Sequence, residues 1–153
     1  MTIAPIIRTV EVKARPQRAF ELFTRRFGEW WPKGRTPAAS PHVEVVLEPH
    51  VDGRWFEIDA AGVETDWGKV LAWDPPTRLV LAWQLNAEFK YDPDLTTEVE
   101  VTFAPEGDGT RVTLEHRNLE RFGADAERMT ALLGGGWPGF LNDFAEYASH
   151  HLA

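Results

Sequence analysis

Between His42 and Arg117 the hydrophobic residues recur with a two-residue period, and this long alternating run limits the chain to folds built on an antiparallel sheet. Turn-forming dipeptides such as Asp52-Gly53 and Asp108-Gly109 separate the alternating segments. Because the connections are short, consecutive segments are expected to pair as hairpins in a meander. The predicted strands are His42–Glu48, Arg54–Ile58, Glu64–Trp73, Arg78–Leu85, Thr97–Ala104 and Thr110–Arg117.

The last two strands predict which face of this sheet is buried. Val99, Val101 and Phe103 alternate with polar residues, so we expect them to face the core while Glu98 and Glu100 face solvent. The next strand continues the inward face with three residues: Val112, Leu114 and His116. A sheet with one apolar face has to be covered by another layer.

The C-terminal segment predicts a helix that provides this cover. Five large or apolar residues recur at steps of three and four and therefore share one helical face: Trp137, Phe140, Leu141, Phe144 and Ala148. Three glycines at 134–136 are expected to interrupt the chain, and Pro138 fits a first helical turn. We therefore predict one helix from about Gly136 to Leu152 and a separate short helix at Asp125–Leu133.

The N-terminal part predicts a strand at Ile6–Val12 and a helix that starts at Pro16, followed by a second short turn that ends in Trp30 and Trp31. Residues 32–41 contain three prolines and predict an irregular loop. The expected fold is α+β: a curved antiparallel sheet wrapped around a long C-terminal helix, with short helices after the first strand. At this length we predict one domain over residues 1–153, with a cavity between helix and sheet.

The sequence resembles the START-like or SRPBCC superfamily, which has the helix-grip fold, and within it the branch of the C-terminal domain of the Hsp-90 ATPase activator. The matching stretches are Ala19–Thr24, Trp30–Pro32, Trp67–Pro76, Arg78–Trp83, Thr97–Phe103, Leu114–Arg117 and Gly136-Trp137. The resemblance covers essentially the whole chain. It implies the fold, but the superfamily includes binding proteins, cyclases and co-chaperone domains. That activator has a further N-terminal domain, so we expect this chain not to stimulate a chaperone ATPase by itself.

Several kinds of chemistry are disfavoured by the residues present. The chain has no cysteine, and neither Ser40 nor Ser149 lies in a nucleophile elbow. The five histidines show no metal-ligand spacing, and the glycine pattern at 134–139 follows a predicted helix rather than a strand, so we predict neither a metal nor a nucleotide cofactor. A net charge of −8 disfavours nucleic acid. Without a membrane-length apolar run or a signal-like N-terminus, the expected location is cytoplasmic.

The seven tryptophans either fill the core or line an apolar cavity. The candidate ligand-binding residues are Trp31, Trp55, Trp67, Trp83, Phe103, Leu114, His116, Trp137, Phe140, Leu141 and Phe144. His116 is either a hydrogen-bonded core residue or a group that orients a ligand or transfers protons. Four further residues could join it, although the pattern leaves their facing open: Glu44, Arg54, Glu57 and Lys69. The loop Asn86–Leu95 is a candidate for the cavity mouth.

The favoured function is binding of a hydrophobic or amphipathic small molecule, such as a lipid or polyketide, without an assigned catalytic residue. One alternative is a cyclase or hydratase that uses His116 as acid or base. A second is a module that interacts with a chaperone, as the family resemblance implies. A homodimer is also left open.

Overall fold

The computed structural model describes residues 2–32 and 42–152, and these form a seven-stranded antiparallel sheet in the order β1-β7-β6-β5-β4-β3-β2. The strands are β1 Ile6–Val12, β2 His42–Leu47, β3 Arg54–Asp59, β4 Glu64–Asp74, β5 Arg78–Trp83, β6 Thr97–Glu106 and β7 Gly109–Arg117. All the predicted strands are confirmed, with ends that differ by no more than two residues. The predicted proline-rich loop, apart from Pro32, lies outside the described residues.

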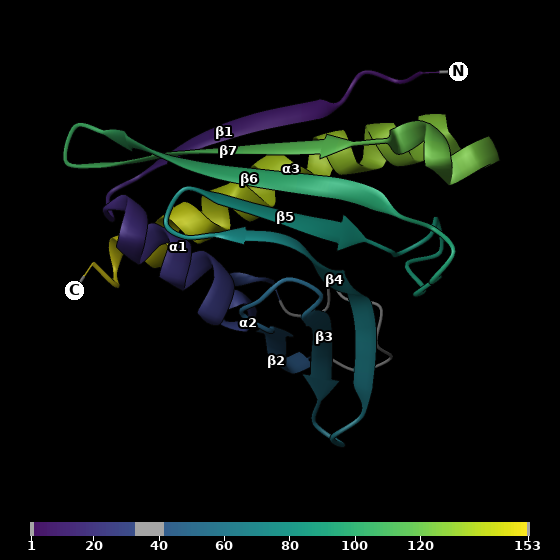
Figure 1. The fold of residues 1–153 in the computed structure, drawn as a ribbon, viewed down its shortest axis with the longest axis horizontal. Helices are drawn as coiled ribbons and strands as arrows, with labels where there is room; N and C mark the ends of the chain where they lie inside the picture. The colour runs from purple at the N-terminus through teal and green to yellow at the C-terminus, as the bar shows by residue number, and fades with distance from the viewer. Residues whose placement is uncertain (1, 33–41, 153) are drawn as a thin grey trace.

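Extra residues in β4 bend the sheet. Trp55 pairs with Gly68 but Phe56 pairs with Asp66, so Trp67 is an extra residue without a register partner in β3. A second irregularity follows at Leu71, between the pairs Val70–Leu81 and Ala72–Val80. Bulges of this kind kink a strand and increase its twist. Figure 1 shows the result: the strand direction turns strongly between β5 and β3, and the helices lie on the concave side of the sheet.

The helices confirm the predicted helix-grip arrangement. Helix α1 (Pro16–Arg25) and the short α2 (Phe27–Trp30) follow β1, as expected from the positions of Pro16 and Trp30. After β7 comes a 3-10 segment, η1 (Leu119–Asp125), and then the long α3 (Ala126–Ser149), which lies behind the sheet in Figure 1. No helix in the described parts of the chain is long and apolar enough to cross a membrane.

The predicted break at the three glycines is wrong. Helix α3 runs without interruption through residues 134–136, and Pro138 lies inside it rather than in its first turn. One face is buried along both halves of the helix, from Met129 and Leu133 through Trp137 to Phe144. Each glycine costs only about 1 kcal/mol relative to alanine in a helix, and burial of this continuous stripe outweighs that cost.

Arg8 compensates for the proline in α3. Pro138 has no N–H, so the carbonyl of Gly134 loses its partner within the helix. The Arg8 guanidinium reaches across from β1, and its Nη2 donates to that Gly134 oxygen at 3.1 Å. A side chain at position 134 would crowd this contact, because a Cβ there would lie 3.3 Å from Arg8 Nη2. Arg8 thus ties the first strand to the middle of the last helix.

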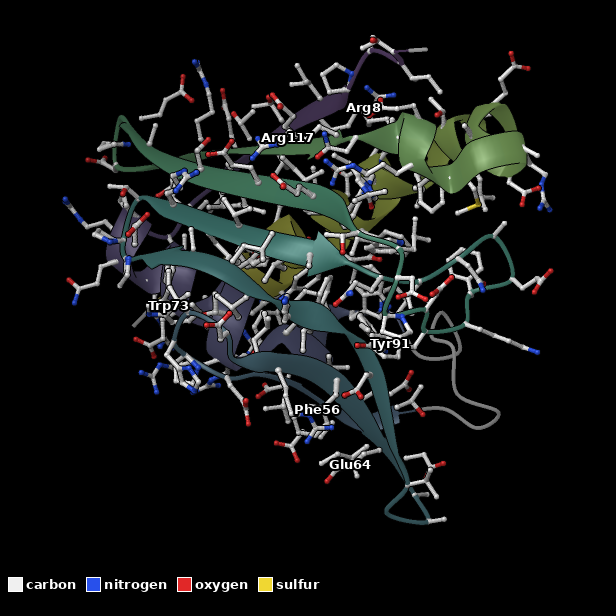
Figure 2. All side chains as sticks on the ribbon, turned by 45° about the vertical axis from the view of Figure 1, so that its right-hand side comes forward. Arg8, Phe56, Glu64, Trp73, Tyr91 and Arg117 are labelled. Atoms are coloured by element: carbon white, nitrogen blue, oxygen red, sulfur yellow. The ribbon has the colours of Figure 1, made fainter. Side chains whose placement is uncertain are left out.

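The outer face of the sheet carries an ion-pair cluster rather than two freely solvated acids. Arg117 binds Glu98 at 2.9 Å and Glu100 at 2.6 Å, while Arg78 binds the other oxygen of Glu100. The hydrogen bond from Arg117 lowers the pKa of Glu100. Figure 2 labels Arg117 on this face, away from the helices. The predicted outward direction of Glu98 and Glu100 is confirmed, but both are partly buried and paired.

Candidate ligand-binding site

Seven of the predicted residues form a group of mutually contacting rings, here called the inner ring cluster: Trp31, Trp55, Trp67, Trp83, His116, Trp137 and Phe140. Trp31 stacks on Phe140 with 4.2 Å between ring centroids. The other contacts include edge-to-face arrangements, such as that of Trp83 with Trp137 at 5.7 Å. Six of the seven are buried and Phe140 is half-buried, so the cluster forms the wall between sheet and α3 with one ring near solvent.

The strand register explains how these rings meet. Trp55 of β3 lies opposite Gly68 of β4, which in turn lies opposite Trp83 of β5. Gly68 has no side chain to separate the two indoles, whose centroids are 6.0 Å apart. A Cβ at Gly68 would lie only 1.7 Å from the Ala82 carbonyl oxygen, so this strand pairing requires glycine.

The other predicted wall residues lie apart from this cluster or add no ring to it. Phe103 and Phe144 both contact Phe23, in a second aromatic group near α1. Leu114 and Leu141 are buried core residues. Sequence reasoning also missed a neighbour of the cluster: Phe27, which contacts three of its rings, Trp31, Trp55 and Trp67. Its position four residues before Trp31 was the available signal.

His116 lies in the middle of a linear chain of hydrogen bonds that runs from the Trp137 indole to the Trp83 carbonyl. The Trp137 indole N–H donates to His116 Nδ1 at 3.2 Å, which identifies the Nδ1 atom as an acceptor. The proton of the neutral ring is therefore on Nε2, which donates to Thr97 Oγ1 at 2.8 Å. The Thr97 hydroxyl donates in turn to the Trp83 carbonyl at 3.2 Å. Both ring nitrogens are engaged, which matches the hydrogen-bonded core interpretation of His116.

Burial of His116 predicts an acid-sensitive fold. Desolvation lowers its pKa from 6.5 to about 3. Between these values the unfolded chain binds the proton and the folded chain does not, so the stabilisation is fully present above pH 6.5 and is lost as the pH falls. We expect His116 to contribute a slope of about 1.4 kcal/mol per pH unit to the free energy of unfolding below pH 6. Urea titrations of the wild type and of His116→Gln, which cannot titrate, measure this slope, and equal slopes in both would contradict it.

Of the four polar residues whose facing was open, only Glu57 enters the core. It is fully buried and accepts a 2.9 Å hydrogen bond from the Trp67 indole. Arg54 instead lies on the outer face, where it covers the Phe56 ring at 3.9 Å and binds Glu64 and Asp66. Figure 2 labels Phe56 and Glu64 near each other on this part of the surface. Glu44 and Lys69 are exposed.

The loop after β5 lines a surface hollow. Residues Asn86, Asp92 and Leu95 share a hollow of about 240 Å³ with Arg121 and Phe122. The centroid of the Phe122 ring lies 6.5 Å from that of His116. Phe122 therefore connects the lining of this hollow to the His116 ring of the inner ring cluster. Within the described residues, no three histidine or acidic side chains are placed to share a metal ion.

The fold and the aromatic interior define an α+β helix-grip protein of the START-like class. The model of the family described as Activator of Hsp90 ATPase homolog 1-like protein matches residues 13–149. The chain therefore belongs to this family, and the resemblance stated from the sequence is confirmed. No curated protein sequence gives a significant match.

Solved structures give more specific similarities. The chain is 38% identical to Txn09, an anthrahydroquino-gamma-pyrone synthase, with a TM-score of 0.67 and coverage of 95% of this chain and 97% of that one. It is 35% identical to CalC, a self-sacrificing resistance protein from Micromonospora echinospora, with a TM-score of 0.70 and coverage of 98% and 97%. The Aha1 dimer from Colwellia psychrerythraea, at 16% identity, a TM-score of 0.69 and coverage of 96% and 97%, shares the fold.

Proposed function

We propose that the protein binds a flat hydrophobic small molecule, of the aromatic polyketide type, between the sheet and α3. The observation that carries this proposal is the inner ring cluster, which gathers five indoles and a phenyl ring beside the buried polar groups of Glu57, Thr97 and His116. Ligand sites combine such aromatic walls with a few placed polar groups. The similarity to a synthase of an anthrahydroquinone-pyrone product supports a ligand with fused aromatic rings.

The described rings touch one another, so a ligand has to separate some of them. We expect the ligand to separate Trp31 from Phe140, because Phe140 is the half-buried member of the cluster and this stack is therefore the one nearest solvent. A flat molecule that slides between these two rings exchanges one stacked contact for two. This geometry favours planar ligands over flexible alkyl chains, which cannot reproduce the offset stacking of rings.

The synthase similarity also favours a second function, an enzyme of the cyclase type. His116 is a poor acid or base for it, because both ring nitrogens are bonded and the low pKa keeps the ring neutral. A buried carboxylate is the better candidate, and Glu57 lies directly beside Trp67. Turnover by the wild type and its loss in Glu57→Gln, with ligand binding retained, would support this function. A module that interacts with a chaperone stays the second alternative.

Binding is tested by titration of the protein with an aromatic tricyclic ketone and, in parallel, with a fatty acid. We expect the aromatic ligand to quench intrinsic tryptophan fluorescence and to raise the melting temperature, since a ligand at 100 times its Kd stabilises the folded state by about 2.7 kcal/mol. Trp73→Phe is the matched control, because Trp73 lies outside the cluster against Phe20 and its loss should leave the quenching intact. No change in fluorescence and melting temperature with any aromatic ligand would refute the proposal.

A further inference from the structure

Two indole N–H groups in the inner ring cluster are buried without a hydrogen-bond acceptor. Trp55 and Trp83 are almost completely inaccessible, at 0% and 2% exposure, and neither Nε1 atom has a partner among the described residues. Two other indoles of the same cluster are paired: Trp67 donates to Glu57 and Trp137 donates to His116. Native proteins pair nearly all their buried donors, so two unpaired ones in adjacent rings require an explanation.

We infer that Trp55 and Trp83 donate their indole N–H groups to the ligand, and that the ligand is a neutral, planar aromatic carbonyl compound, such as an aromatic ketone or a quinone. This inference rests on the proposed function and specifies its ligand. Two side chains that the sequence analysis predicted only as apolar walls of the site thus become hydrogen-bond donors to the ligand.

The proximity of the two rings favours a single shared ligand. The Trp55 and Trp83 rings contact each other at 6.0 Å with their planes 68° apart, across the strip where Gly68 provides no side chain. Donors on neighbouring rings can reach one oxygen atom, or two oxygen atoms on one fused ring system. A carbonyl oxygen offers two lone pairs and brings no donor that would itself need a partner.

The surrounding charges favour a neutral acceptor over a carboxylate. No lysine or arginine is among the buried side chains of the described residues, so none of these residues brings a buried cation to compensate a ligand anion. Glu57 lies one indole away from Trp55, since its partner Trp67 contacts Trp55 at 5.3 Å. A second carboxylate near it would raise the cost of burial further. Fatty acids therefore fit this end of the site less well than ketones.

The test compares fluorenone with fluorene, which share one planar tricyclic skeleton and differ in a single carbonyl oxygen. Fluorenone is better hydrated than fluorene, so the ratio of their Kd values for one protein also contains a solvation difference. The informative quantity is the change in this ratio from the wild type to a variant. We expect Trp55→Phe and Trp83→Phe each to reduce the preference for fluorenone about 5-fold, the effect of one lost hydrogen bond. Trp30→Phe is the matched control, because the Trp30 N–H is already bonded to the Phe23 carbonyl at 3.3 Å. Its preference should equal that of the wild type.

A measurement without variants keeps the inference testable if a substitution prevents folding. In protein labelled with ¹⁵N at tryptophan, fluorenone should shift the Trp55 and Trp83 indole N–H resonances downfield, whereas fluorene should not, and the Trp30 resonance should stay in place. If both ligands bind but cause the same shifts and the ratio of Kd values is insensitive to the variants, the inference is wrong while the proposed function stands. A water molecule that stays bonded to both N–H groups in the complex would also overturn it. If neither ligand binds, and no other aromatic ligand changes the fluorescence or the melting temperature, the proposed function itself fails.

Discussion

Replacing Trp137 with alanine is expected to lower the free energy of unfolding by about 3–5 kcal/mol. The indole is 2% exposed and contacts four rings of the inner ring cluster, so its removal leaves a large cavity between α3 and the sheet. It also removes the donor to His116 Nδ1, which then lies buried without its partner. Since small domains have a total stability of about 5–15 kcal/mol, this loss removes a large part of the stability of the fold. Chemical denaturation followed by circular dichroism measures the loss.

Trp137→Phe separates the two causes. Phenylalanine retains most of the apolar contact but has no N–H, so we expect a smaller loss of about 1–2 kcal/mol. A loss below about 1 kcal/mol in Trp137→Ala would show that α3 is not anchored through this residue.

Gly68→Ala is expected to destabilise the fold by at least about 3 kcal/mol, although only one methyl group is added. The new Cβ would overlap the Ala82 carbonyl oxygen at 1.7 Å, and that oxygen belongs to the neighbouring strand rather than to a mobile side chain. The ladder between β4 and β5 has to open to relieve the overlap, which separates Trp55 from Trp83. The melting temperature and near-ultraviolet circular dichroism of the tryptophans should both change.

Gly135→Ala is the matched glycine control. A Cβ at Gly135 meets nothing within 4 Å, and the residue lies in the interior of α3. Alanine is there expected to stabilise the protein by about 0.5–1 kcal/mol, because it has the higher helix propensity. If the effect of Gly68→Ala is instead as small as that of Gly135→Ala, the overlap at Gly68 is relieved by a small backbone shift and the prediction is wrong.

The strands were predictable because alternation and turn dipeptides are local signals, and the inward direction of Val99 to Phe103 followed from them. The inward direction of Glu57 could not be predicted, because Trp55, Phe56 and Glu57 are all buried and β3 therefore shows no alternation. The pattern also gave no sign that Arg54 covers Phe56 on the outer face. Whether the indole N–H groups of Trp55, Trp67, Trp83 and Trp137 have an acceptor depends on contacts between elements far apart in the sequence, which no local pattern contains. The continuity of α3 was missed for the same reason. Its glycines and proline are locally unfavourable, and the compensating contact from Arg8 comes from 126 residues away.

That contact has a consequence for the dynamics of the chain. The carbonyl that Pro138 leaves free is bonded only while β1 is in place, so the centre of α3 and the first strand should open together. Hydrogen exchange would then report one cooperative unit made from the two ends of the chain, with matching opening free energies for amides of β1 and for those around Gly134. Arg8 and Pro138 should also change together among related chains, because a residue with an N–H at 138 makes the guanidinium dispensable. The termini, far apart in sequence, would form a single unit of stability.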